Sequence, residues 1–329
     1  MLSFFILTLS FQKSFPQNSS SVDTAWVRHY TGASNSSNHL TALAVDESGN
    51  VYVTGSSGSS TNTDYTTIKY NASGDEQWLV RYNGAANGND NTTALAIDGD
   101  GNIYVTGMSE GIGTDRDYAT VKYNASGIEQ WVVRNDGPNN TVDKATAIAV
   151  DGAGNVYVAG GIDGQYHVVL AGLILPGNFA TIKYNASGVE QWIVTYDEAG
   201  SEETGATALA VDDSGNVFVS GYSHHYNPTG PDTQSYITIK YNSSGSEQWI
   251  ARYDGPPNYV GGVSELAVDD GGNVHIAVLG GDGSTYEAYV AIKYNASGAE
   301  QWVARYSGFN LPTALAKALT LLHNTTCLT

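Results

Sequence analysis

The feature that most constrains this chain is a ten-residue stretch, Lys-Tyr-Asn-Ala-Ser-Gly-Val-Glu-Gln-Trp, which ends at Trp192. It recurs almost unchanged four more times, ending at Trp78, Trp131, Trp249 and Trp302, and a degraded copy of its end surrounds Trp26. The chain is therefore a tandem repeat with a period in the low fifties. Repeats of this kind fold as units that stack on their neighbours.

Each full repeat has the pattern of four β-strands joined by tight turns. In the first repeat, Val51 and Val53 alternate with Tyr52 and Thr54, which is the two-residue period of a strand. A glycine ends each four-residue turn, as Gly74 does, and supplies the left-handed backbone conformation that a tight hairpin needs. The pattern therefore predicts an all-β chain.

The spacing within the repeats shows which parts are fixed. Each of the first five tryptophans is followed 17 residues later by the Leu or Ile of the next inner strand, and each motif tyrosine precedes its tryptophan by 8 residues. The length varies only between the second and third strands, so one loop per repeat is free to change. Four-stranded antiparallel units that stack radially are the blades of a β-propeller. We expect five complete blades, at about residues 41–82, 93–135, 146–196, 207–253 and 264–306.

The two ends of the propeller predict an incomplete sixth blade. The sequence around Trp26 matches an outer strand, and residues 313–316 match the start of the inner strand at residues 41–44. This blade lacks its middle two strands and leaves unpaired strand edges, which favours self-association of the chain. A closed five-bladed ring with two stray ends is the alternative. The propeller then spans residues 22–316, and an irregular tail follows at residues 317–329.

Two halves of the repeat carry a family resemblance. Ala-Val-Asp-x-x-Gly-Asn-Val-Tyr-Val-x-Gly, followed by Ile-Lys-Tyr-Asn-Ala-Ser-Gly-x-Glu-Gln-Trp, closely resembles the SBBP β-propeller repeat family over about residues 24–316. Members occur in large secreted or surface-attached bacterial proteins, so the resemblance implies an exported propeller that is a fragment of a larger protein. The family carries no defined catalytic set, and no active residues are transferred. The Asn-x-x-Gly-x-x-x-Trp part also resembles the tryptophan-docking motif of quinoprotein dehydrogenase propellers, which implies a Trp packed on the turn of a neighbouring blade.

Charge and cysteine content exclude several classes of partner and site. The net charge of −19 argues against nucleic acid or an anionic membrane surface as partner, because both need clustered Lys and Arg. Ten of the fourteen basic residues lie in the motif or shortly after its tryptophan, so we expect an acidic variable surface. Cys327 is the only cysteine, which leaves no disulfide framework and no cysteine-based metal site.

Residues 1–21 resemble part of an export signal and a linker. Leu2 to Phe11 form an apolar run that is too short to span a bilayer, and a polar stretch follows. No Lys or Arg precedes the run, and no small-x-small cleavage site is visible near Pro16, so a disordered apolar tail is the alternative. We expect a secreted or cell-surface protein without a stable membrane span.

The turns contain apparent ligand motifs. Residues 98–102 resemble a calcium loop, but the sibling turns have Ser, Ala or Gly at the third position, so a shared ligand role fails. We expect an Asp side chain that is hydrogen-bonded to the backbone of its own turn instead.

The motif asparagine and lysine also have two interpretations each. The asparagine, as at Asn71, begins an N-glycosylation sequence and also opens a tight turn, and we favour the turn. We expect the motif lysine to pair across the strands with a glutamate, as Lys69 with Glu76; a lysine ring that binds an anion in the central channel is the alternative.

The loop between the second and third strands carries the candidate ligand-binding residues, because binding residues gather on loops held by a rigid scaffold. This loop expands to residues 161–178 in the third blade and contains adjacent histidines in the fourth. Adjacent histidines point in different directions, so we expect ordinary loop residues and no metal site. The candidates are Asp163, Tyr166, His167, His224, His225, Tyr226 and Asp232, and the structural repeat positions are Trp26, Trp78, Trp131, Trp192, Trp249 and Trp302.

The sequence contains no nucleophile elbow, phosphate loop or zinc-protease helix. Its carboxylates lack the paired, partly buried setting that general acid–base catalysis requires. We therefore expect a non-catalytic binding, adhesion or scaffold module without a cofactor, with glycans or other surface proteins as partners. The alternative is a propeller enzyme that acts on glycans with residues from several loops around the channel. A deep, loop-rimmed pocket with clustered carboxylates and histidines favours the enzyme, and an open face favours binding.

Overall fold

A computed structural model describes residues 24–32, 36–59, 62–167, 173–175, 177–198, 203–225, 233–255, 260–281 and 287–307, together with Ser201 and Gly230. All regular elements of this part of the chain are β-strands. The same part contains no helix that is long and apolar enough to cross a membrane.

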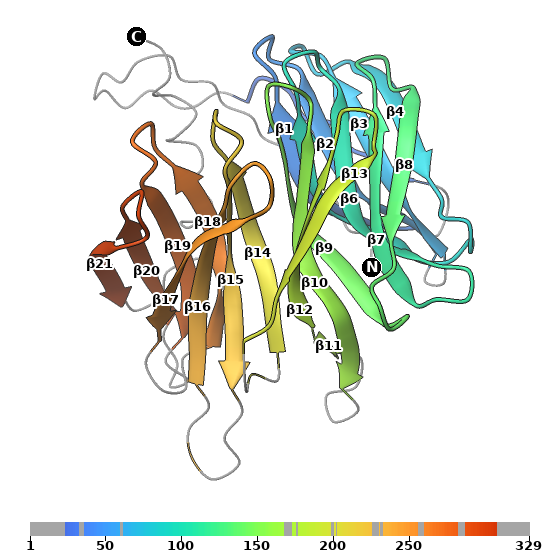
Figure 1. Ribbon diagram of the computed structural model, residues 1–329. Coiled ribbons are helices and arrows are strands. Elements are labelled where there is room, and N and C mark those ends of the chain that lie inside the picture. Colours follow the sequence, from blue (N-terminus) through green and yellow to red (C-terminus); the bar gives the residue numbers. More distant parts are fainter. Residues whose placement is uncertain are drawn as a thin grey trace.

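The strands form five antiparallel sheets, which we number as blades 1 to 5 in chain order (Figure 1). Blade 1 contains β1 (Ser37–Val45), β2 (Val51–Ser59), β3 (Asn62–Tyr70) and β4 (Glu76–Tyr82). Blade 2 contains β5 (Asp90–Ile97), β6 (Ile103–Glu110), β7 (Arg116–Tyr123) and β8 (Glu129–Asn135). Blade 3 contains β9 (Val142–Val150), β10 (Val156–His167), β11 (Leu173–Leu175), β12 (Asn178–Tyr184) and β13 (Glu190–Tyr196). Blade 4 contains β14 (Glu203–Val211), β15 (Val217–His225), β16 (Thr233–Tyr241) and β17 (Glu247–Asp254). Blade 5 contains β18 (Val260–Val268), β19 (Val274–Gly281), β20 (Glu287–Tyr294) and β21 (Glu300–Ser307).

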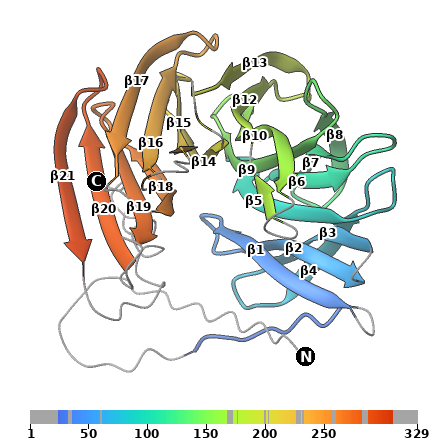
Figure 2. The same cartoon turned by 90° about the horizontal axis from the view of Figure 1, so that it is seen from below.

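The blades are arranged around a common centre with the first strand of each blade innermost (Figure 2). The inner strands β1, β5, β9, β14 and β18 pack against one another in that order. The predicted all-β propeller of four-stranded antiparallel blades is confirmed. In blade 3, β11 adds a short extra strand beside the end of β10.

The hydrophobic core lies between neighbouring blades, because each strand presents apolar residues to both faces of its sheet. Successive strand residues point to opposite faces of a sheet. Accordingly Val51 packs in a cluster with Ile68 of its own blade, whereas Tyr52 packs in a different cluster with Ile103 and Val105 of blade 2. Val51 and Tyr52 are both completely buried. A single blade therefore has no core of its own.

Four tryptophans each join one blade to the next, and Trp26 joins the N-terminal segment to blade 1 in the same way. Trp78 Nε1 donates to the carbonyl oxygen of Ala125 at 3.1 Å, and the indole lies against Gly127, whose φ is 79°. The predicted docking of the motif tryptophan on a neighbouring turn is confirmed. Equivalent hydrogen bonds of 3.0 to 3.2 Å join Trp26 to Ala72, Trp131 to Ala186, Trp192 to Ser243 and Trp249 to Ala296. Trp302 has the same place in its sheet, but it is 44% exposed.

Residues 24–32 occupy the position of the outer strand of a sixth blade without forming a strand. Arg81 donates to the hydroxyl of Tyr30, just as Arg134 of blade 2 donates to Tyr82 of blade 1 at 3.2 Å. The predicted N-terminal outer strand is wrong in this respect, because no described strand lies beside residues 24–32 to supply ladder hydrogen bonds. The predicted C-terminal inner strand lies outside the described residues.

The Asp turn after each inner strand is held by its own side chain. Asp98 Oδ1 accepts hydrogen bonds from the backbone N–H of Asp100 at 3.0 Å and of Asn102 at 2.9 Å. Its Oδ2 accepts from Asn102 Nδ2 and from the Tyr104 hydroxyl, both at 2.8 Å. Burial alone raises the pKa of Asp98, but these hydrogen bonds outweigh it and hold the pKa below its ordinary value. The predicted role of this Asp in the turn is confirmed.

The Asn turn before each outer strand is built in the same way. Asn71 Oδ1 accepts from the backbone N–H of Ser73 at 3.0 Å and of Asp75 at 2.8 Å. Gly74 closes the turn at φ 79°. The predicted role of the motif asparagine in the turn is thereby confirmed.

The predicted pairing of the motif lysine with glutamate is wrong. The Lys69 ammonium lies 5.0 Å from the centre of the Tyr52 ring, and Nζ donates to the carbonyl oxygen of Ala125 at 3.5 Å. The reason is the strand register: Lys69 lies opposite Trp78, and a bulge separates it from the next pair, Tyr70 with Glu76. The lysine therefore covers an aromatic ring and links two blades. Lys122, Lys183 and Lys240 lie over Tyr104, Tyr157 and Phe218 in the same way.

Substitution of Gly127 by Ala tests the docking contact. A Cβ at Gly127 would lie 2.9 Å from Trp78 Cδ2, so the indole must shift. Gly101→Ala is the matched control, because Gly101 has a φ of 76° and its Cβ would meet only the Ala125 methyl at 3.4 Å. We expect both variants to lose about 1–2 kcal/mol of unfolding free energy from left-handed strain. Gly127→Ala loses a further ~1–3 kcal/mol from overpacking. Urea unfolding followed by tryptophan fluorescence measures both, and equal losses would contradict the docking role.

Replacement of Asp98 by Asn tests the Asp turn. A pKa that folding lowers contributes stability that is present above the unfolded pKa and is lost as the pH falls through the folded pKa. We therefore expect Asp98→Asn to cost about 1–2 kcal/mol at neutral pH, through weakened hydrogen bonds to the carboxylate, and less in acid, below the ordinary Asp pKa. Asp100→Asn is the control: it removes a charge from the same turn but keeps the Asp98 carboxylate that accepts the hydrogen bonds. It should change the unfolding free energy little at any pH. Urea unfolding at several pH values measures the difference, and a pH-independent cost would refute this account.

Candidate functional site

The predicted loop of blade 3 contains strands. β10 continues to His167 and pairs with β11, with Gln165 opposite Leu175 and His167 opposite Leu173. The prediction that Asp163, Tyr166 and His167 lie in a loop is therefore wrong, because the backbone past the edge of the sheet continues as a paired hairpin. The side chains of these three residues lie outside the described part of the structure.

The two histidines of blade 4 also belong to a strand. His224 and His225 end β15, where they lie opposite Gln234 and Thr233 of β16. Successive strand residues point to opposite faces, so the two imidazoles do not converge on one ligand. His225 Nε2 lies 3.3 Å from Ser223 Oγ. The candidates Tyr226 and Asp232 lie outside the described residues. The other five candidates lie on two separate hairpins, one in blade 3 and one in blade 4.

A group of carboxylates that sequence analysis missed lies between blades 2 and 3. Asp117 is the second residue of β7, Asp136 follows β8, and Asp143 is the second residue of β9. One carboxylate oxygen from each lies within 4.8 Å of the others, and Asp117 and Asp143 are buried. The only sequence signal was the Asp that precedes the fixed Leu or Ile of the inner strand by five residues, as Asp143 does in blade 3 and Asp90 in blade 2.

Arg134 ties the carboxylate group to the scaffold. Its Nη2 lies 2.7 Å from Asp117 Oδ2, and its Nη1 donates to Ser109 Oγ at 2.5 Å. Burial lowers the pKa of Arg134, but the hydrogen bonds to Asp117 and Tyr82 outweigh it and raise the pKa above its ordinary value. Asp143 Oδ2 accepts from the backbone N–H of Gly137 at 2.6 Å. One oxygen from each of three carboxylates is fewer than the six to eight oxygens that Ca²⁺ takes, and Arg134 already neutralises part of their charge. The arrangement fits a structural clamp between blades.

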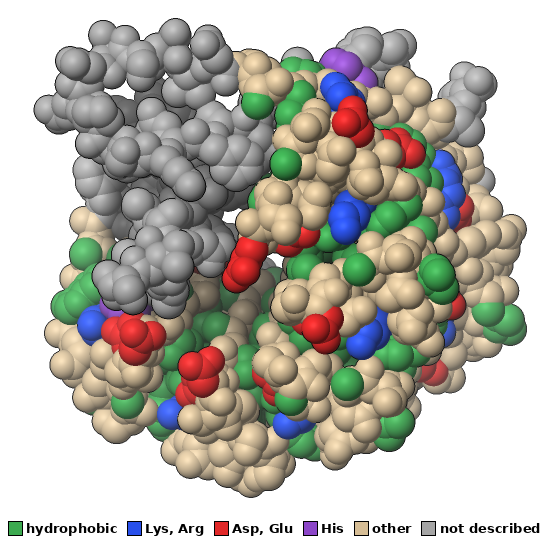
Figure 3. All heavy atoms as spheres, turned by 90° about the horizontal axis from the view of Figure 1, so that it is seen from above, with side chains coloured by type: hydrophobic (Ala, Val, Ile, Leu, Met, Phe, Trp, Pro, Cys, Tyr) green, Lys and Arg blue, Asp and Glu red, His purple; other side chains and the backbone are tan. Residues whose placement is uncertain are grey.

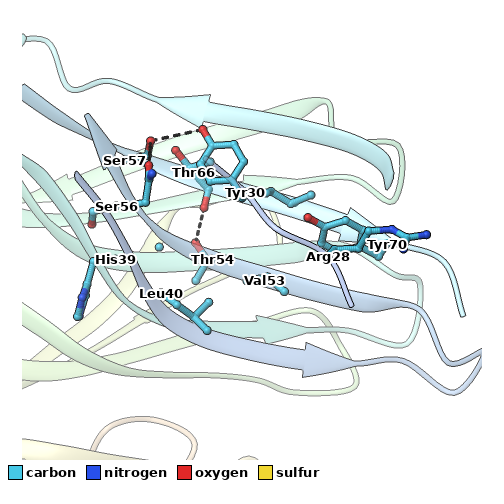
Figure 4. A pocket seen from close by; sticks show the side chains of 13 residues that line it. Arg28, Tyr30, His39, Leu40, Val53, Thr54, Ser56, Ser57, Thr66 and Tyr70 are labelled. Atoms are coloured by element: carbon cyan, nitrogen blue, oxygen red, sulfur yellow. Dashed lines mark hydrogen bonds between the residues drawn. The ribbon is translucent and has the colours of Figure 1, made fainter. Parts of the chain in front are cut away.

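A cavity lies between residues 24–32 and the face of blade 1 (Figure 4). Its walls include Arg28 and Tyr30 on one side and Leu40, Gly55 and Thr66 on the other. The cavity volume is about 70 Å³, well below the roughly 300–1,000 Å³ of small-molecule sites. It is at one end of the row of blades and not at the centre of the ring. No local sequence pattern predicts this cavity, because its two walls come from different repeats.

The face opposite the long hairpins is acidic around the centre. Figure 3 shows Asp and Glu side chains around the opening between the blades. The turns that follow the inner strands carry exposed carboxylates there, at Glu47, Asp100, Asp213 and Asp270. These turns are short and similar from blade to blade, so among the described residues this face offers a charged rim.

Comparison with solved structures finds matches of low sequence identity. A protein of unknown function from Dyadobacter fermentans DSM 18053 has 10% identity and a TM-score of 0.44, with 83% of this chain and 95% of that chain covered. The polysaccharide lyase Uly1 has 14% identity and a TM-score of 0.44, with 87% and 64% covered. The β-propeller domain of the Trilobed protease from Pyrococcus furiosus has 11% identity and a TM-score of 0.37, with 84% and 99% covered.

Comparison of the sequence itself identifies the repeat. No curated protein matches the chain. The SBBP family, described as a beta-propeller repeat, matches residues 26–62 and 80–116. The first match runs from Trp26 through the inner strands of blade 1, and the second begins in the outer strand of blade 1 and ends at the start of β7. The resemblance predicted from the sequence is thus confirmed at these two stretches, which match SBBP β-propeller repeats.

Proposed function

We propose that the protein is a non-catalytic binding, adhesion or scaffold module that acts outside the cell or on its surface, with glycans or other surface proteins as partners. The repeated polar residues support this proposal, because they are engaged in holding the fold. Asp98 binds its own turn, Lys69 covers Tyr52, and Arg134 clamps neighbouring blades. None of these side chains is left to do chemistry on a substrate.

The observation that carries the proposal is the pair of long hairpins at one end of blades 3 and 4 (Figure 1). β10 with β11 forms the first hairpin, and the ends of β15 and β16 form the second. Both are paired strands on a rigid scaffold, which suits recognition of a partner at low entropic cost. The hairpins differ in sequence from the short connection of blade 1, so specificity is expected to reside in them.

The alternative, an enzyme that acts on glycans, draws on the carboxylates of Asp117, Asp136 and Asp143. Glycosidases use a pair of carboxylates that flank the scissile bond, one of which must be able to give up a proton. Here Arg134 holds Asp117 through a buried ion pair at 2.7 Å. The cavity of about 70 Å³ is near blade 1 and not beside these carboxylates. Both facts support binding over catalysis.

A glycan array tests the binding function. Two variants are prepared in which residues 163–177 or residues 223–234 are shortened to the length of the blade 1 hairpin. If the hairpins carry recognition, each variant loses at least about tenfold in affinity for the glycans that the intact chain binds. Ile112→Ser is the matched control, because Ile112 is 76% exposed on the equivalent connection of blade 2. This control should bind like the intact chain.

Two outcomes count against the proposal. Unchanged binding in both shortened variants, with the far-ultraviolet circular dichroism spectrum intact, places recognition elsewhere. Release of soluble sugar from a polysaccharide, abolished by Asp143→Asn while the fold is retained, favours the enzyme. Surface proteins immobilised beside the glycans test the second class of partner in the same experiment.

A further inference from the structure

Two kinds of contact recur at the junctions between blades, besides the tryptophan. The first comes from an inner-strand threonine: Thr93 Oγ1 of blade 2 donates to the carbonyl oxygen of Ala145 in blade 3 at 2.7 Å. The second comes from an aromatic residue of the third strand. The Tyr65 hydroxyl of blade 1 donates to the carbonyl oxygen of Ala119 at 3.3 Å and lies over Gly107, where an added Cβ would meet it at 2.8 Å.

The same contacts recur along the row of blades. The inner-strand hydrogen bonds include Thr146 to Ala206 at 2.7 Å and Thr207 to Val263 at 2.9 Å. The third-strand aromatics include Tyr118 over Gly160 and Phe179 over Gly221. Blades 2 and 3 thus have a donor face, with a hydroxyl and an aromatic, and blades 3 and 4 have an acceptor face, with a carbonyl and a glycine. Blade 5 accepts through the Val263 carbonyl but has Val278 at the position of the glycine.

The acceptor face of blade 1 has these positions, and they line the cavity shown in Figure 4. By strand register Leu40 corresponds to Ala145, Gly55 to Gly107 and Thr66 to Ala119. Residues 24–32 supply an indole and a tyrosine, but no described strand supplies the inner hydroxyl or the third-strand aromatic. Thr66 Oγ1 is buried there without a hydrogen-bond partner among the described residues. The cavity therefore lies where the inner strands of a neighbouring blade pack at the other junctions.

The backbone register of blade 5 places a tryptophan, a tyrosine and a serine at the donor positions at the other end of the row. Trp302 lies opposite Lys293 and Tyr289 opposite Tyr306, in the register of Trp78 with Lys69 and Tyr65 with Tyr82 in blade 1. Ser264 occupies the bulge position of the inner strand, where Thr93 lies in blade 2. Trp302 is 44% exposed, whereas the docked Trp26 is 8% exposed.

We propose that blade 5 of one copy of the chain docks on blade 1 of a second copy. Trp302 then donates to the carbonyl oxygen of Ala72 and packs on Gly74 of the second copy, as Trp26 does within one chain at 3.1 Å. Blades 1 and 5 of a single chain lie at the two ends of the row, on opposite sides of the opening (Figure 2). The contact joins two different surfaces, so it is head-to-tail and repeats from copy to copy.

Residues 24–32 compete with the second copy for the acceptor face. The Trp26 indole packs on Gly74. Arg28 lies 3.5 Å from Asp75, and the Tyr30 hydroxyl lies 3.4 Å from Ser57 Oγ. These are side-chain contacts, without the ladder hydrogen bonds of a strand. A tethered segment nevertheless has a high effective concentration, so association of the full chain requires high protein concentration and rises when the segment is weakened.

Sedimentation velocity over a range of micromolar concentrations tests the proposal on the full chain. We expect Trp26→Ala to tighten self-association by at least about tenfold, because it frees the acceptor face. Trp302→Ala removes the donor and should leave a monomer at all concentrations, alone or combined with Trp26→Ala. Ile128→Ala is the control, because Ile128 is an exposed apolar residue on a turn away from both end faces, and this variant should behave like the unmodified chain.

The proposal is overturned if Trp26→Ala stays monomeric or associates equally well with and without Trp302. Residues 308–329 are another potential occupant of the acceptor face. If Trp26→Ala associates only after these residues are deleted, the tail fills the cavity and the proposal is wrong. Tyr30→Phe keeps the indole docked and loses only the hydroxyl contacts to Arg81 and Ser57. Tyr30→Phe should therefore tighten self-association to a smaller extent than Trp26→Ala. If circular dichroism shows that Trp26→Ala does not fold, Tyr30→Phe is the variant that tests the proposal, and unchanged association would overturn it.

Discussion

The contact of an indole with the turn of the next blade is the interaction on which the rest of this structure depends. Burial of a tryptophan removes about 150–250 Å² from water, which at about 25 cal/mol per Å² corresponds to an upper limit of about 4–6 kcal/mol. The indole N–H also finds a carbonyl acceptor, at 3.0 to 3.2 Å in five cases. Because Val51 and Tyr52 of one strand serve two different clusters, no blade can fold its core without a neighbour.

The turns make this contact reproducible. Gly127 must be left-handed and without a side chain so that Trp78 can lie flat on it. The Asn turn and the Asp turn are each held by one polar side chain that accepts several backbone hydrogen bonds. The lysine over the neighbouring aromatic ring adds a second layer above the same junction. Most repeated polar residues thus shape the junction between blades. This structural role explains why the same polar residues recur in every repeat.

Much of the fold could be predicted from the sequence, and the site far less. The spacing of tryptophans, the strand alternation and the turn residues predicted four-stranded blades, because all of these are local or repeat with a fixed interval. The pairing of Lys69 with Glu76 failed, because a bulge beside Tyr70 shifts the register and no residue count shows it. The carboxylates near Asp117 and the cavity beside Leu40 were not predictable, because each is assembled from two blades. The assignment of His167 to a loop failed because strand pairing past the edge of the sheet leaves no simple pattern.

The docking of each tryptophan on the very next repeat has an evolutionary consequence. Every junction involves side chains from two adjoining repeats, so unequal recombination between the near-identical coding segments can duplicate or delete a whole blade without creating an unfamiliar contact. The new blade meets the same indole, the same glycine and the same carbonyl as the one it replaces. The number of blades can therefore change one blade at a time. The angle between successive sheets then decides which of the resulting chains can close into a ring.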